Sequence, residues 1–200
     1  MNEFVFDKQL DHIVDEQNGY LRIIDVQRRG ISKYRILTYI RGTGMTKVGA
    51  GVYAVPGAQN DWMYYLQIRN RRIIFSYESA MYLNGLSSKE PANPTISVVR
   101  GYNAKHIKDK GVIVHTVPEE WFELGVTEGT TKFGNKVRIY DQDRCICDLI
   151  RRRSRIDPEV YREAITKYFT DETRNYDKLR EYAKIMQMED KLAQYTGEDI

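Results

Sequence analysis

The stretch GISKYRILTYIRGTGMTKVGAGVYAVP, Gly30–Pro56, decides the fold of the N-terminal part of the chain. Ser32 is a suitable N-cap for a helix, and Ile36, Leu37 and Ile40 recur at the spacing that places them on one buried face. Beyond this helical segment, MTKV and VYAV are separated by GAG, which is the pattern of a small β-hairpin. The stretch therefore predicts a helix followed by a hairpin.

The residues before this stretch predict two more helices. The first has apolar side chains at helical spacing, namely Phe4, Phe6, Leu10, Ile13 and Val14. Asn18–Tyr20 is a helix stop, and Ile23–Arg28 forms the second helix. Gly30 then suits a tight turn because glycine avoids the steric cost of a positive φ. Three helices with a short turn before the third, and a hairpin after it, predict a winged helix-turn-helix.

Basic residues are concentrated in the same part of the chain. The whole chain carries a net charge of +3. Between Tyr20 and Ala58, seven basic residues face one acid, Asp25, which gives +6 over 39 residues. Arg151–Ile200 instead holds 11 basic and 11 acidic residues. The local excess is typical of a surface that binds a polyanion.

The outward face of the third helix is predicted to enter the major groove of DNA, and the hairpin to lie on the flanking backbone. The side chains expected to read base edges or nearby phosphates are Ser32, Tyr34, Arg35 and Thr38, flanked by Lys33 and Tyr39. Arg28, Arg29, Arg41 and Lys47 are expected to position the DNA backbone. A solvated basic face, or a module that binds an acidic protein, remains an alternative.

After Pro56 the pattern changes, and GAQND at Gly57–Asp61 predicts a linker. The predicted fold class is α+β, with a winged helix-turn-helix over 1–58 and a mixed α/β domain over 59–200 that ends in a helical bundle. Strands are expected at Thr95–Val99, Val112–Val117, Val126–Thr131 and Lys136–Tyr140, the last two joined by a hairpin turn at KFGN. Helices follow from Asp141, which is expected to cap the first of them, and Asp157 is the N-cap of another, before Pro158.

Several segments, in order along the chain, resemble the AbiEi-type antitoxins of bacterial type IV toxin–antitoxin, or abortive infection, systems. These segments are NGYLRIIDVQRRGISKY, VGAGVYAVP, SYESAMYLNGL, VVRGYN, FGNKVRIYDQDRCICDLIRRRSRIDPE and REYAKIM, which run from Asn18 to Met188. The most specific is YDQDRCICDLI, in which Tyr140, Asp141, Arg144, Ile146, Cys147, Asp148 and Leu149 fall on the family's pattern. Ala50 departs from that pattern, because the hairpin tip of these proteins often carries Arg.

The resemblance implies a non-enzymatic repressor that binds inverted repeats in double-stranded DNA upstream of its own operon. It also implies a C-terminal domain that counteracts a nucleotidyltransferase-like toxin without a stable complex. A monomer in solution that pairs on DNA is compatible with this interpretation. The candidate residues of the antitoxin domain are Glu78, Tyr140, Asp141, Arg144, Asp148, Arg151, Arg152 and Arg153.

Other functions leave weaker signals. No apolar run approaches about 18 residues, and the N-terminus carries acids where a signal peptide needs a basic start, so we expect a cytoplasmic protein without a membrane partner. Cys145 and Cys147 give no zinc pattern, and no glycine-rich phosphate loop is present, so we expect no cofactor. An enzyme with a catalytic C-terminal domain remains the alternative, with Asp141, Asp143, Asp148 and Glu78 as its metal cluster. Arg151–Arg155 either clamps nucleic acid or is a solvated loop.

Overall fold

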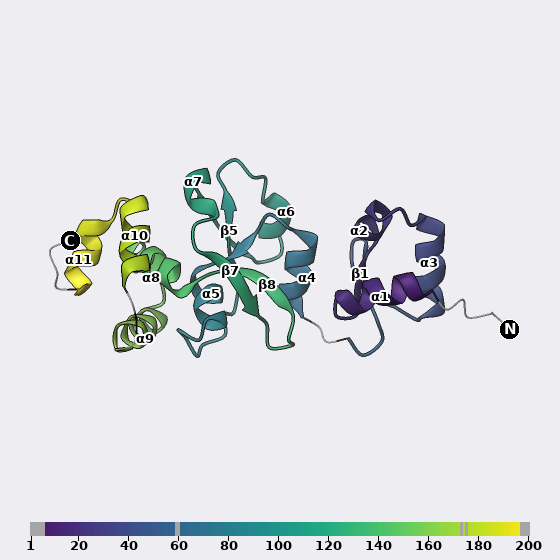
Figure 1. Cartoon of the computed structure of the whole chain (residues 1–200), viewed down its shortest axis with the longest axis horizontal. Helices are drawn as coiled ribbons and strands as arrows, with labels where there is room; N and C mark the ends of the chain where they lie inside the picture. The colour runs from purple at the N-terminus through teal and green to yellow at the C-terminus, as the bar shows by residue number, and fades with distance from the viewer. Residues whose placement is uncertain (1–6, 59–60, 173, 175, 197–200) are drawn as a thin grey trace. The chain divides into compact units, whose positions relative to one another are not determined.

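The structure is a computed structural model that describes residues 7–58, 61–172, 174 and 176–196, without the side chain of residue 155. It divides into two compact units, Met1–Arg69 and Asn70–Ile200 (Figure 1). The sequence suggested a division after residue 58, whereas the structure groups the next helix with the first unit. Phe4 and Phe6, predicted for the first helix, lie outside the described residues.

The described residues of unit 1 form four helices and a three-stranded antiparallel sheet. Its elements are α1 (Lys8–Glu16), β1 (Tyr20–Arg22), α2 (Ile23–Arg28), α3 (Lys33–Gly42), β2 (Thr46–Gly49), β3 (Val52–Ala54) and α4 (Trp62–Arg69). The strand order is β1-β3-β2. The predicted helices and hairpin are therefore present, while β1, which pairs with β3 through Tyr20 and Ala54, was not predicted.

Local chemistry explains where the helices of unit 1 begin. The Asp7 side chain accepts a hydrogen bond from the backbone N–H of Leu10 and caps α1. Ser32 caps α3 in the same way, as predicted, by accepting from the N–H of Arg35. Between α2 and α3, Gly30 has φ +84°, which confirms the predicted tight turn. The apolar faces of the helices then meet in one core of Leu10, Ile13, Val14, Leu21, Val26, Ile31, Ile36, Ile40 and Met45.

Helix α4 belongs to unit 1 because its residues pack on the small sheet. The Tyr64 ring meets the Tyr20 ring edge to face, with centroids 5.1 Å apart. The backbone N–H of Asp61 donates to the Tyr20 hydroxyl over 3.3 Å. A Cβ on Gly49 would lie only 1.9 Å from the Tyr65 hydroxyl oxygen, so glycine is what lets the aromatic ring approach β2.

Unit 2 is built around a five-stranded mixed sheet of order β6-β5-β4-β8-β7. The strands are β4 (Ile74–Phe75), β5 (Thr95–Val99), β6 (Ile113–Val117), β7 (Val126–Thr130) and β8 (Lys136–Tyr140). β5 and β6 are parallel, as are β4 and β8, whereas β4–β5 and β7–β8 are antiparallel. The predicted strands and the hairpin between β7 and β8 are confirmed.

The helices of unit 2 come mostly after the sheet. They are α5 (Tyr77–Leu83), α6 (Lys105–Lys108), α7 (Glu119–Phe122), α8 (Gln142–Arg151), α9 (Pro158–Phe169), α10 (Asp177–Ile185) and α11 (Glu189–Thr196), with a 3-10 turn at Arg153–Arg155. Helices α8–α11 gather at one side of unit 2 (Figure 1). Asp141 and Asp157 cap α8 and α9, as predicted. Over the ranges described, no helix is both long and apolar enough to cross a membrane.

Helix α8 is the buried centre of the C-terminal helices. Cys145 and Cys147 lie on it, both buried and neither in a disulfide. Burial raises the pKa of both thiols, so they are protonated and unreactive at neutral pH. The two thiols therefore contribute to the packing of α8.

Candidate nucleic-acid interface

Helix α3 is held in unit 1 by one apolar face. Ile36 and Ile40 are buried in the core, and Leu37 packs against it at the margin. Burial of each such side chain contributes about 1.5–3 kcal/mol to stability. The opposite face of the helix is therefore fixed toward solvent.

The solvent face of α3 carries Lys33, Tyr34, Thr38 and Arg41, all exposed. Tyr34, Thr38 and Arg41 are spaced i, i+4, i+7, so they form one stripe along the helix. Tyr34 is 78% exposed, which is unusual for an aromatic side chain without a partner surface. We call these four residues the α3 face. It offers two cations, two hydroxyl groups and an aromatic ring on one side of a rigid helix.

Arg35 does not belong to this face, although the sequence suggested that it reads bases. Its guanidinium group binds both carboxylate oxygens of Asp7, with Nε–Oδ2 at 2.5 Å and Nη2–Oδ1 at 2.7 Å. These hydrogen bonds from Arg35 lower the pKa of the Asp7 carboxyl. The pair ties the first turn of α3 to the first turn of α1, so Arg35 positions the helix.

Tyr39 was also predicted at the outward face, and here the prediction is wrong. The side chain is buried, because position 39 lies on the same side of the helix as Ile36 and Ile40, which face the core. Its hydroxyl donates to Oδ1 of Asp11 over 2.7 Å. Burial raises the pKa of Tyr39, and the residue forms a second link between α3 and α1.

The predicted backbone contacts divide into paired and available cations. Arg29 binds Oε2 of Glu16 at 2.8 Å, and Arg28 lies 3.8 Å from Oδ1 of Asp25. Arg41 donates only to the carbonyl of Leu37. Within the described parts of the chain, Lys33, Arg41 and Lys47 form no ion pair, and all three are exposed.

Acids at the N-cap and the end of α1 neutralise part of the positive charge that the sequence predicted for this surface. Asp7 and Glu16, which lie outside the basic stretch in the sequence, neutralise Arg35 and Arg29 in the fold. Unit 1 as a whole has nine basic and seven acidic residues, a net charge of +2. Of the basic residues predicted to contact DNA, those without an ion pair among the described residues are thus Lys33 and Arg41 on the α3 face and Lys47 on the exposed strand β2.

The motif residues of unit 2 form a buried polar network. Arg144, with a fully buried side chain, binds Asp148 at 3.1 Å and lies 4.1 Å over the Tyr140 ring. It also donates to the carbonyl oxygens of Trp121 and Leu124 at 2.6 and 2.9 Å. Because Nε of Arg144 donates to Asp148 and Nη1 donates to the two carbonyl oxygens, this side chain holds α8 to the segment around α7.

The four acids considered as a metal cluster have separate partners. Asp141 caps α8 and binds Lys178, while Asp143 accepts from Tyr168. Asp148 binds Arg144 and Arg151, and Glu78 accepts from Thr95. Within the described residues, no group of three or more His, Cys, Asp or Glu side chains is arranged to hold a metal ion.

The three consecutive arginines after α8 have different surroundings. Arg151 binds Asp148 at 3.3 Å and lies 4.7 Å over the Trp121 ring. Arg152 lies 3.3 Å from Nδ1 of His115 and near the Tyr77 ring. Arg153 is exposed beside the Tyr161 ring. They do not form one continuous clamp, and only Arg153 presents its charge to solvent without an ion pair among the described residues.

Comparison with known proteins gives limited information. The chain matches no protein-family model and no curated protein sequence. Among solved structures it is similar to the RV2827C protein from Mycobacterium tuberculosis, with a TM-score of 0.58 and 11% sequence identity. The match covers 96% of this chain and 76% of that chain. At this identity the similarity concerns the fold alone, and the fold class of the chain is α+β.

Proposed function

We propose that unit 1 is a winged-helix DNA-binding domain, and that the protein is the autorepressor and antitoxin of a type IV toxin–antitoxin system. The observation that carries the DNA-binding part is the α3 face. A helix of ten residues is about 15 Å long, which suits insertion into the major groove. The β2–β3 hairpin is then the wing, and Lys47 is its phosphate contact.

The contacts support a division of labour on the DNA. Tyr34 and Thr38 read base edges, because a ring and a methyl group can contact a thymine methyl and their hydroxyls can hydrogen-bond. Lys33, Arg41 and Lys47 bind phosphates. Arg35 stays on Asp7 and fixes the angle of α3.

The number of available cations predicts the salt dependence. Three phosphate contacts give a slope of about −2.7 in log K against log salt concentration for each chain. Seven would give about −6. Because Arg28, Arg29 and Arg35 are paired with acids, we expect the shallower slope, that of three phosphate contacts.

The direct test is a fluorescence anisotropy titration of the full chain with the duplex upstream of its own operon. A shuffled duplex of equal length is the control, and both are measured across a series of salt concentrations. We expect tighter binding to the upstream duplex and a slope near −3 per bound chain. Equal affinity for both duplexes would contradict sequence-specific recognition, and absence of binding would contradict the DNA-binding role.

The antitoxin role is supported by the collinear motifs that run through both units. We expect the full chain to restore growth of cells that express the neighbouring nucleotidyltransferase-like protein. A Tyr34→Ala variant is the matched control, since it should bind the operator more weakly and still restore growth. If the full chain does not restore growth, the antitoxin role is wrong while the DNA-binding role stands on its own test.

A further inference from the structure

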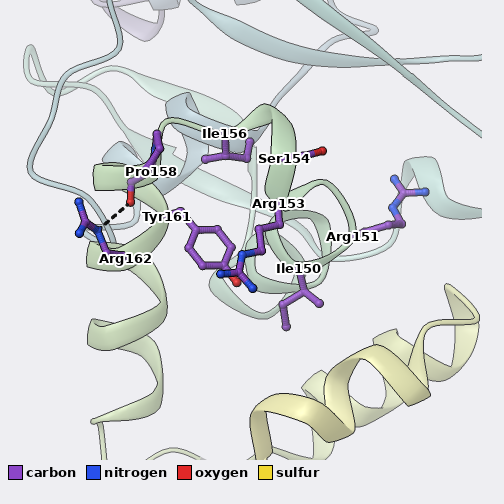
Figure 2. Close-up of a pocket in the computed structure, with 8 residues that line it drawn as sticks. All are labelled: Ile150, Arg151, Arg153, Ser154, Ile156, Pro158, Tyr161 and Arg162. Atoms are coloured by element: carbon purple, nitrogen blue, oxygen red, sulfur yellow. Dashed lines mark hydrogen bonds between the residues drawn. The ribbon is translucent and has the colours of Figure 1, made fainter.

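A pocket lies where α8 ends and α9 begins, in unit 2. Its volume is about 680 Å³, within the range of small-molecule sites. Figure 2 shows the lining residues, with Arg153 and Tyr161 near the centre. The lining consists of Ile150, Arg151, Arg153, Ser154, Ile156, Pro158, Tyr161 and Arg162. It therefore contains three arginines, an aromatic ring, a hydroxyl group and apolar side chains, without an acid.

Acids near the pocket are occupied by cations that lie outside it. Asp157 binds Lys89 at 2.8 Å, and Glu159 lies 3.8 Å from the same ammonium group. Glu163 binds Lys167 at 2.9 Å. Arg153 and Arg162 consequently have no ion pair with any residue that the structure describes. The pocket keeps a positive charge that its own surroundings do not cancel.

Arg153 and Tyr161 give the pocket a flat wall. The guanidinium carbon lies 5.2 Å from the Tyr161 ring centroid, and Figure 2 shows the two groups side by side. The Tyr161 hydroxyl is hydrogen-bonded to the Tyr195 hydroxyl at 2.5 Å, which fixes the ring. A guanidinium group beside an aromatic ring can stack on a further planar group while it donates to an anion.

We infer that this pocket binds a nucleotide, with its phosphates on Arg153 and Arg162 and its base against the wall formed by Tyr161 and the apolar side chains. A nucleotide combines a polyanion with a planar group of low polarity, which is the combination that the lining matches. Ser154 supplies a hydroxyl that can bond to a phosphate or a ribose. This site is separate from the DNA-binding face of unit 1 and does not depend on it.

A DNA backbone clamp fits the same residues less well. A clamp needs several exposed cations in a row, whereas Arg151 and Arg152 are half-buried against Asp148, Trp121, His115 and Tyr77. Ile150, Ile156 and the Tyr161 ring also have nothing to contact on a phosphate chain. The apolar part of the lining thus favours a ligand with a base over phosphate alone.

The test is calorimetric titration of the full chain with ATP, GTP, CTP and UTP. Each nucleotide is titrated separately, in buffer that contains EDTA. Inorganic triphosphate is the probe that lacks a base. We expect saturable binding of at least one nucleotide, one per chain, and about tenfold weaker binding of inorganic triphosphate. Arg153→Ala should weaken nucleotide binding by about tenfold, because it removes a charge-assisted contact. Arg100→Ala, which changes an exposed arginine outside the pocket, should leave it unchanged.

Several results would overturn the assignment. One is that none of the four nucleotides binds. Another is that inorganic triphosphate binds as tightly as a nucleotide. A third is that the Arg153→Ala and Arg100→Ala variants lose nucleotide affinity to the same extent. Binding of a short single-stranded DNA with no binding of any nucleotide would assign the pocket to a nucleic acid strand instead. Because Arg153 is exposed, the Arg153→Ala variant should have the same thermal unfolding midpoint as the wild type. A loss of nucleotide binding in this variant then reports on the pocket and not on folding.

Discussion

Arg35 on α3 and Asp7 at the N-cap of α1 form a two-point ion pair, with nitrogen–oxygen distances of 2.5 and 2.7 Å. The carboxylate also caps α1 through the N–H of Leu10. One acid therefore fixes a helix start and neutralises the arginine that would otherwise be the strongest candidate for base contact. The pair sets the position of α3, and under the proposed function it also limits the strength of DNA binding.

The first prediction concerns release of Arg35. In Asp7→Asn the cap is retained, because Asn caps helices as well as Asp does, but the ion pair is lost. Arg35 then becomes available to a phosphate, so we expect tighter binding to duplex DNA and a salt slope larger by about one. The measurement is anisotropy against salt concentration, for the operator duplex and a shuffled duplex.

The matched control is Asp15→Asn, which removes one charge from the exposed side of the same helix. Its salt slope should stay at the wild-type value. If both variants change the slope equally, the effect is one of net charge and the specific role of the Asp7–Arg35 pair is wrong.

The second prediction concerns the buried pair of unit 2. Asp148→Asn leaves the fully buried Arg144 without its counter-charge, and breaking such a pair costs about 3–5 kcal/mol. Asp177→Asn is the control, since Asp177 and Arg180 form an exposed pair at the same i,i+3 spacing as Asp148 and Arg151. The Asp177→Asn substitution should lower the free energy of unfolding by less than about 1 kcal/mol. Urea unfolding measures both, and equal costs would contradict a structural role for the motif.

The third prediction concerns acid stability. Hydrogen bonding to Lys167 lowers the pKa of Glu163 to about 2, with further hydrogen bonds from the Ser88 N–H and the Ser87 hydroxyl. Because the folded-state pKa lies below the ordinary value of 4.5, the stabilisation is complete above that pH and is lost as the pH falls toward 2. Glu163→Gln should therefore be less stable than wild type at pH 7, and the difference should shrink below pH 4.5. A difference that stays constant over this range contradicts the assignment.

The sequence predicted the elements whose signals are local. Ser32, Asp141 and Asp157 cap the helices for which they were expected, and Gly30 adopts the expected positive φ. These features depend on neighbours within a few residues, so spacing alone reveals them.

The sequence could not predict interactions between distant segments. Charge counted over a window missed that Asp7 and Glu16 face Arg35 and Arg29, since those acids lie on another helix. The strand β1 has three residues and is defined by pairing with β3, which leaves little local pattern. The contact of Arg153 with the Tyr161 ring spans only eight residues, but it depends on how the 3-10 turn leads into α9, which residue spacing does not reveal.

Sequence-specific DNA binding by the α3 face can be measured by comparing three variants on the operator and shuffled duplexes. We expect Tyr34→Ala and Thr38→Ala to reduce the preference for the operator, with each base contact worth about 1–3 kcal/mol. Lys47→Ala should instead weaken binding to both duplexes alike and reduce the salt slope by about one. If Tyr34→Ala and Thr38→Ala leave both affinities at wild-type values, α3 does not read DNA and the account is wrong.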